Sequence, residues 1–149
     1  MENLIIKSPA KINLFLKVIK KLSNGYHELE TAFQLIDVFD TIEFQNTSNK
    51  INVSCSDVSI DEEENIVFKA ATLLKKVTDR NVGANIKIIK NIPTGAGLGG
   101  GSSNAASTIC ALNKMWGLGL SKKDMMLIGL DLGADVPLFI KGENSFGGG

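Results

Sequence analysis

A glycine-rich segment from Ile92 to Asn104 carries the clearest chemical signal in the chain. It reads I-P-T-G-A-G-L-G-G-G-S-S-N, and five of the chain's 15 glycines fall between Gly95 and Gly101. Glycines let a backbone curl until its N–H groups converge on an anion, and a helix that starts just after them adds positive dipole potential. Ser102 and Ser103 add hydroxyls that can donate to a phosphate, cap the helix or ligate a metal. The segment predicts a cradle for a polyphosphate.

The residues around this cradle exclude several familiar phosphate-binding classes. A P-loop ends in Gly-Lys-Ser/Thr, but this segment contains no lysine. The pattern G-x-G-x-x-G is present, yet a dinucleotide-binding fold needs an acid at the end of a second strand about twenty residues on, and that position is Asp124, in a predicted helix cap. Neither H-R-D nor D-F-G follows, and no G-x-S-x-G occurs, so protein-kinase and serine-hydrolase chemistry are excluded.

Composition narrows the function classes further. The 149 residues include 16 basic and 16 acidic side chains, so the formal net charge is zero, and 44% are hydrophobic. This length and composition predict one globular domain. The chain also lacks the excess of basic residues that is typical of a nucleic-acid-binding protein. Two distant cysteines and a single histidine exclude a disulfide framework and a Cys/His zinc site. With no signal peptide or membrane segment predicted, we interpret the chain as cytoplasmic, with neither nucleic-acid nor membrane partners.

The elements that must position the cradle begin with strands. Residues 11–18 alternate, with apolar side chains at Ile12, Leu14 and onward, which predicts a strand whose apolar face is buried. Ser23-Asn24-Gly25 predicts a tight turn. Further strands are expected at 41–44, 51–55 and 85–89, so the sheet should be mixed and mostly antiparallel.

Helices are expected to cover this sheet. Apolar residues recur at helical spacing over 65–79, after an acidic run at 61–64 that suits a helix start. A buried helix is predicted over 102–116, directly after the glycines. Ser121-Lys122-Lys123-Asp124 is a capping box that should begin a helix ending near Gly133. A last short strand is expected at 138–140. A mostly antiparallel sheet covered by helices is an α+β fold, which is the fold class we expect.

Four motifs in order give the chain a resemblance to the GHMP kinase superfamily, which includes the galacto-, homoserine and mevalonate kinases. They are Ser8-Pro9-Ala10-Lys11-Ile12-Asn13-Leu14, Asn24-Gly25-Tyr26-His27, the glycine segment through Ala106, and Gly133-Ala134-Asp135-Val136-Pro137. Within the superfamily they are similar to the kinases that act on a cytidine-diphosphate-linked methylerythritol. The resemblance implies ATP-dependent phosphorylation of its 2-hydroxyl in non-mevalonate isoprenoid biosynthesis, with Mg²⁺.

The resemblance also implies roles for individual residues. Lys11 and Asp135 match the catalytic pair. Tyr26 and His27 match the positions that hold the cytosine, Asn13 faces the substrate beside Lys11, and Asn65 lies near the adenine. The ATP phosphates would be bound by the stretch we call the glycine loop: Pro93, Thr94, Gly95, Ala96, Gly97, Leu98, Gly99, Gly100, Gly101, Ser102 and Ser103.

The residues themselves support the proposed pair. Phosphoryl transfer to an alcohol needs a carboxylate that accepts the hydroxyl proton and a cation near the attacking oxygen. Asp135 lies in a glycine-to-proline corner and could be that base, with Lys11 keeping it ionised. The protein ligands of Mg²⁺ stay unassigned, with Ser102 or Ser103 the nearest candidates.

The resembling kinases are roughly twice as long as this chain. Residues 1–149 are therefore expected to be a truncated protein, the N-terminal ATP-binding and catalytic domain, with the C-terminal domain absent. Two alternatives remain open: another GHMP kinase, of the homoserine or mevalonate type, or a non-catalytic nucleotide-binding fragment.

Overall fold

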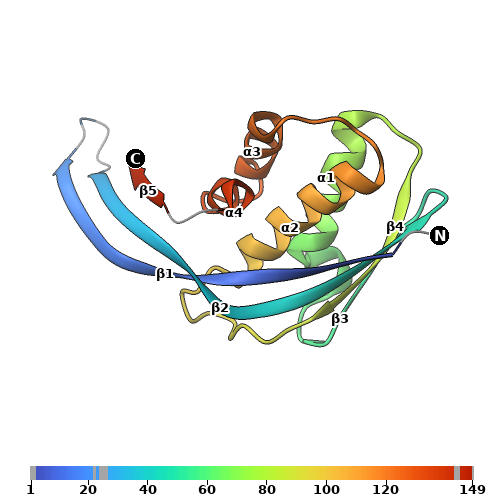
Figure 1. The fold of residues 1–149 in the computed structure, drawn as a ribbon, viewed down its shortest axis with the longest axis horizontal. Helices are drawn as coiled ribbons and strands as arrows, with labels where there is room; N and C mark the ends of the chain where they lie inside the picture. The colour runs from blue at the N-terminus through green and yellow to red at the C-terminus, as the bar shows by residue number, and fades with distance from the viewer. Residues whose placement is uncertain (1–2, 22, 24–26, 143–144, 149) are drawn as a thin grey trace.

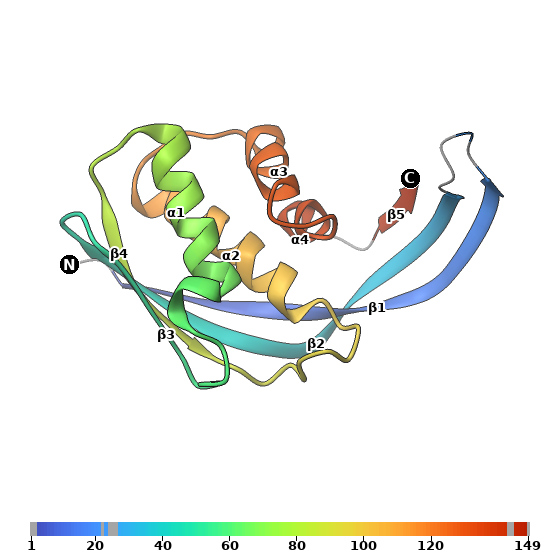
Figure 2. The same ribbon diagram turned by 180° about the vertical axis from the view of Figure 1, so that it is seen from behind.

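The computed structural model describes residues 3–21, 23, 27–142 and 145–148, and its core is a mixed sheet with helices on one face (Figures 1 and 2). Strands β1 (Asn3–Lys21), β2 (His27–Thr47), β4 (Gly83–Ile89) and β3 (Ile51–Cys55) lie in this order across the sheet, and β5 (Ser145–Gly148) also pairs with β2. Only the β3–β4 pairing is parallel within the described residues. The expected α+β, mostly antiparallel fold is confirmed.

The helices follow the predicted order. A 3-10 turn, η1 (Glu62–Glu64), precedes α1 (Ile66–Thr78), and α2 (Gly100–Met115), α3 (Lys122–Leu130) and α4 (Val136–Lys141) complete the layer. The predicted capping box of α3 is present, because the Ser121 hydroxyl accepts from the Asp124 N–H and the Asp124 carboxylate accepts from the Ser121 N–H. None of the helices in the described part of the chain has the length and apolar character that crossing a membrane requires.

The strand predicted at 138–140 is wrong, because these residues belong to helix α4. Asp135 is the N-cap of α4, and Pro137 lies in the first helical turn, where its missing N–H costs nothing and its fixed φ suits a helix. The helix ends at Gly142 in the left-handed conformation. Its short apolar run buries Phe139 and Ile140 against the core, which a three-residue window could not distinguish from a strand.

The buried apolar face predicted for residues 11–18 of β1 is wrong at Leu14, and the side chains of Leu16 and Val18 lie outside the described part of the chain. Leu14 is 57% exposed, whereas Lys11 is only 5% exposed. The register between β1 and β2 shifts between Pro9 and Lys11, so Ala10 and Lys11 are both buried although they are neighbours. A bulge of this kind changes the face to which the next side chain points, and a second shift lies between Asn13 and Phe15. The first shift thereby places Lys11 on the helix side of the sheet.

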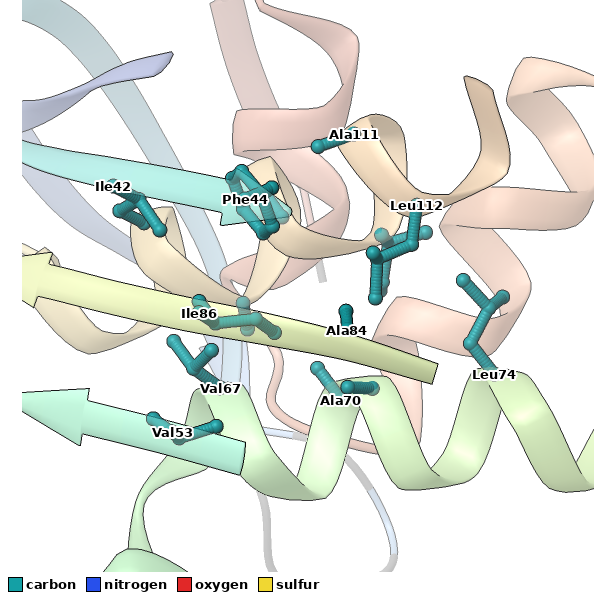
Figure 3. Close-up of a cluster of buried hydrophobic side chains, with 14 of the residues drawn as sticks. Ile42, Phe44, Val53, Val67, Ala70, Leu74, Ala84, Ile86, Ala111 and Leu112 are labelled. Carbon is teal, nitrogen blue, oxygen red and sulfur yellow. The ribbon is translucent and has the colours of Figure 1, made fainter. Parts of the chain in front are cut away.

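The core lies between the sheet and helices α1 and α2 (Figure 3). Ile42 and Phe44 from β2 meet Ile86 from β4, and the helices contribute Leu74 and Leu112. The Trp116 indole N–H, just after α2, donates to the Gly83 carbonyl at 3.1 Å and joins the end of α2 to the start of β4. This packing fixes the start of α2, where the glycine loop ends.

Candidate active site

The glycine loop joins the end of β4 to the start of α2, as expected of a phosphate cradle. Gly95, Gly97 and Gly99 have φ of 77°, 74° and 72°, a region that residues with a Cβ rarely adopt. Gly99 is the N-cap of α2, and its carbonyl accepts from the Ser103 N–H at 2.8 Å. The loop therefore ends at a free helix N-terminus, where backbone N–H groups and the dipole favour an anion.

Lys11 lies directly against this loop. Its backbone N–H donates to the Leu98 carbonyl at 2.9 Å, which joins β1 to the loop. A Cβ placed on Gly99 would lie 3.2 Å from Lys11 Cγ and 2.8 Å from the ring of Phe139, so only glycine fits between strand and helix α4. The Lys11 ammonium donates to Asn13 Oδ1 at 3.1 Å and lies 5.6 Å from the centroid of the Phe33 ring.

Asp135 lies at the start of helix α4, and Phe139 of that helix packs against Gly99 of the glycine loop. Asp135 caps α4 one helical turn before Phe139 and is half-buried, and its carboxylate makes no capping bond to the helix. The adjoining Gly133 lies beside Ser102, since a Cβ there would be 3.9 Å from the Ser102 hydroxyl oxygen. The structure thus brings the Asp135 corner and Lys11 to the same end of the glycine loop.

A cleft of about 420 Å³ opens along the loop. Its walls come from the start of α1, including Asn65 and Ile66, and from the segment after β3, including Asp57. Asn65 caps α1 through a hydrogen bond from the Val67 N–H at 2.9 Å and is 7% exposed. The predicted adenine-side residue and the predicted phosphate loop therefore line one cleft.

The two serines at the start of α2 have different surroundings. Ser103 is 1% exposed, and its hydroxyl is hydrogen-bonded to that of Ser8 in β1 at 2.8 Å. Ser102 is half-buried and lines the cleft. Of these two serines, only Ser102 therefore lines the cleft where a phosphate would bind.

The residues predicted to hold the substrate are placed only in part. Asn13 is exposed, and its side-chain oxygen accepts from the Lys11 ammonium, so the two side chains are in contact. Tyr26 lies outside the described residues. His27 is the first residue of β2, and its side chain lies outside the described part of the chain.

Sequence reasoning missed Asp40, the buried carboxylate behind the loop. Its oxygens accept from the Lys90 ammonium at 2.5 Å, the Asn91 and Ile92 N–H groups at 2.6 and 2.8 Å, and the Asn104 amide at 3.0 Å. Burial raises the pKa of Asp40, but these hydrogen bonds together outweigh it and hold the pKa below its ordinary value.

A signal for Asp40 was present in the sequence. Strand alternation places Asp40 on the same face as Ile42 and Phe44, and all three are at most 1% exposed. An acid on the apolar face of a strand must find donors inside the protein. Lys90 also supplies the cation that the loop itself lacks, because its side chain lines the cleft.

Known proteins are similar to this chain in both sequence and fold. The family model for the GHMP kinases N terminal domain matches residues 65–143. The 4-diphosphocytidyl-2-C-methyl-D-erythritol kinase of Acinetobacter baylyi is 48% identical over 97% of this chain and 52% of its own length. The kinase of the same name from Methylococcus capsulatus is 45% identical over 99% of this chain and 51% of its own length. The chain spans about half the length of the curated relatives it matches.

Solved structures agree with these matches. A crystal structure of 4-(cytidine 5'-diphospho)-2C-methyl-D-erythritol kinase superimposes with a TM-score of 0.87 at 33% identity, covering 98% of this chain and 52% of that one. A mevalonate kinase has a TM-score of 0.67 at 20% identity over 95% of this chain and 48% of its own, which shows a shared fold alone. The glycine loop, the cleft and the family match lead to one conclusion: the chain belongs to the GHMP kinases and carries their N-terminal domain.

Proposed function

We propose that this chain is the ATP-binding half of a kinase that phosphorylates the 2-hydroxyl of 4-diphosphocytidyl-2-C-methyl-D-erythritol. The observation that carries the proposal is the likeness, at 45–48% identity over nearly the whole chain, to kinases named for that substrate. The cleft along the glycine loop supports an ATP site in the same place.

The reaction can be assigned to residues of this chain. The substrate hydroxyl oxygen would attack the γ-phosphorus of ATP, the bond from that phosphorus to the bridging oxygen would break, and ADP would leave. Asp135 would accept the hydroxyl proton, and Lys11 would orient the hydroxyl and keep Asp135 ionised. Their approach to the same end of the loop supports these roles. Asn13, Tyr26 and His27 would hold the substrate.

Magnesium fits the residues of the cleft. The described residues contain no cluster of three His, Cys, Asp or Glu side chains that could hold a metal. Mg²⁺ commonly keeps several waters and takes few protein ligands when it is bound through nucleotide phosphates, so such a cluster is not needed. The Ser102 hydroxyl, which lines the cleft, would be its protein ligand. When bound, the ion neutralises charge on the β- and γ-phosphates.

We also propose that the protein is cytoplasmic. Cys55 and Cys110 are both free thiols, which suits the reducing cytoplasm.

The test is a transfer assay on the full-length protein. With ATP, Mg²⁺ and 4-diphosphocytidyl-2-C-methyl-D-erythritol, we expect ADP and a new phosphate monoester at the 2-hydroxyl, observed by ³¹P NMR. Homoserine and mevalonate serve as comparison substrates under the same conditions. Transfer to either of these, with none to the cytidine compound, would overturn the proposal.

A further inference from the structure

We propose that Asp40 is the positioning residue of the ATP site, because its buried carboxylate holds both the entrance of the glycine loop and the Lys90 ammonium in the cleft. Asp40 would then set the affinity for ATP without touching it. This inference rests on the proposed function for the identity of the nucleotide.

The Asp40 carboxylate is held by hydrogen bonds from four donors. Asn91 and Ile92 donate to Oδ1, and Lys90 and Asn104 donate to Oδ2. A carboxylate accepts about four hydrogen bonds, so its capacity is filled by these donors. Because the side chain is fully buried, a lost donor could not be replaced by bulk water. The carboxylate therefore fixes four donors in one geometry.

The four donors belong to three parts of the proposed ATP site. Asn91 and Ile92 are the last residues before the glycine loop, and their N–H groups fix the direction in which the chain enters it. Asn104 lies in the first turns of α2 and also lines the cleft. Lys90 lines the cleft itself. Asp40 thus connects the entrance of the loop, the helix that follows it and the nearby cation.

The Lys90 ammonium lies at a place that is unfavourable for a cation, and Asp40 holds it there. The ammonium lies beside Gly100, since a Cβ there would be 3.3 Å from Nζ. Gly100 is the first residue of α2, where the helix dipole disfavours a cation. Asp40, together with Asn104 Oδ1 at 3.1 Å, holds the ammonium there. These partners use two of the three donors of an ammonium, which leaves one to meet an anion in the cleft.

The network continues to the strand that carries Lys11. The Asn104 amide also donates to the Ser8 hydroxyl at 3.2 Å, and Ser8 lies three residues before Lys11 in β1. The donors to the Asp40 carboxylate lie in the glycine-loop entrance, in α2 and at Lys90. A change at Asp40 should therefore weaken ATP binding more than binding of the alcohol substrate.

Asp40→Asn in the full-length protein tests this division. Asparagine has the same size as aspartate and keeps one oxygen that can accept from Asn91 and Ile92. Its NH₂ group replaces the other oxygen, so Lys90 and Asn104 lose their acceptor. We expect the Kd for ATP, measured by calorimetry, and the KM for ATP to rise tenfold or more, the scale of losing a hydrogen bond to a charged group. The KM of the alcohol should change less than twofold. Asp37→Asn, on an exposed side chain of the same strand, should leave the Kd for ATP within twofold of wild type.

A second variant covers the case in which Asp40→Asn does not fold. Asp40→Asn with Lys90→Gln leaves no unpaired buried charge, and its folding can be checked by circular dichroism. It should also lose tenfold or more in ATP affinity, because the cleft cation is gone. A folded variant with wild-type affinity for ATP, or one that loses affinity for both substrates equally, would overturn the positioning role. Because calorimetry needs no alcohol, a protein that binds ATP but does not phosphorylate the cytidine compound would refute the proposed substrate alone.

Discussion

Single residues in this site are distinguished by what surrounds them. Asp135 caps α4 without bonding to it, so its carboxylate is available to a substrate. Asp40 is fully enclosed by donors, so its carboxylate can only organise its neighbours. Ser102 and Ser103 differ in the same way, because one lines the cleft and the other bonds to Ser8. Residue type alone predicts none of these differences.

Asp135→Asn is the direct test of the base. Because the amide cannot accept the hydroxyl proton, we expect kcat to fall by about 10²–10⁴-fold while the KM for ATP changes little. Steady-state kinetics on the full-length protein measure both. Asp131→Asn is the matched control, since Asp131 is the exposed residue that ends α3. A kcat for Asp135→Asn equal to that of the control would remove Asp135 from the base role.

The lowered pKa of Asp40 makes part of the stability depend on pH. A carboxylate whose pKa is lower in the folded state stabilises the fold above its unfolded pKa of about 3.9 and loses that contribution as pH falls through the folded value. The gap in unfolding free energy between wild type and Asp40→Asn should therefore shrink from pH 6 to pH 3, as measured by urea unfolding. A gap that widens in acid would contradict this account.

At the level of elements, the sequence predicted helices better than strand faces. The helices at 66–78, 100–115 and 122–130 each cover several turns, so periodicity and a capping box predicted them. Helix α4 has six residues, too few for a helical period to be recognised in the sequence. The burial of Lys11 and the exposure of Leu14 follow register shifts against β2, a pairing that the sequence of β1 does not encode locally.

Three glycines of the loop should respond differently to alanine. Gly99→Ala combines a positive φ with a clash at 2.8 Å against Phe139, so we expect a loss of more than about 1 kcal/mol in unfolding free energy and weaker ATP binding. Gly95→Ala has the positive φ but open space, so it should cost less. Gly101 lies inside α2 with only an ordinary contact, at 3.8 Å, and Gly101→Ala should be neutral or stabilising by up to about 1 kcal/mol. Urea unfolding of the three variants gives the order, and equal losses would contradict it.

For the molecule as a whole, one core supports the site. Helices α1 and α2 pack on the same face of the sheet and share that core (Figures 1 and 3). Composition predicted a single core, because a chain of this length buries enough apolar surface without disulfides. The Asp40 network joins two strands and a helix, so it could not be predicted without the three-dimensional packing.

Leu74→Ala tests how much the packing of α1 against the core contributes to stability. Leu74 in α1 is fully buried, and its truncation should cost about 2–5 kcal/mol in unfolding free energy. Val77 lies in the same helix and is 53% exposed, so Val77→Ala should cost less than about 1 kcal/mol. Denaturant unfolding of both variants makes the comparison, and similar losses at the two positions would mean that α1 does not close the core.

The hydrogen bond from the Lys11 amide to the Leu98 carbonyl gives the site a built-in reporter. This amide proton can exchange with solvent deuterium only when the strand and the glycine loop separate. Its exchange rate therefore counts the openings of the loop, without any probe attached to the nucleotide. Slower exchange on addition of ATP would mean that the nucleotide closes the loop onto the strand that carries Lys11.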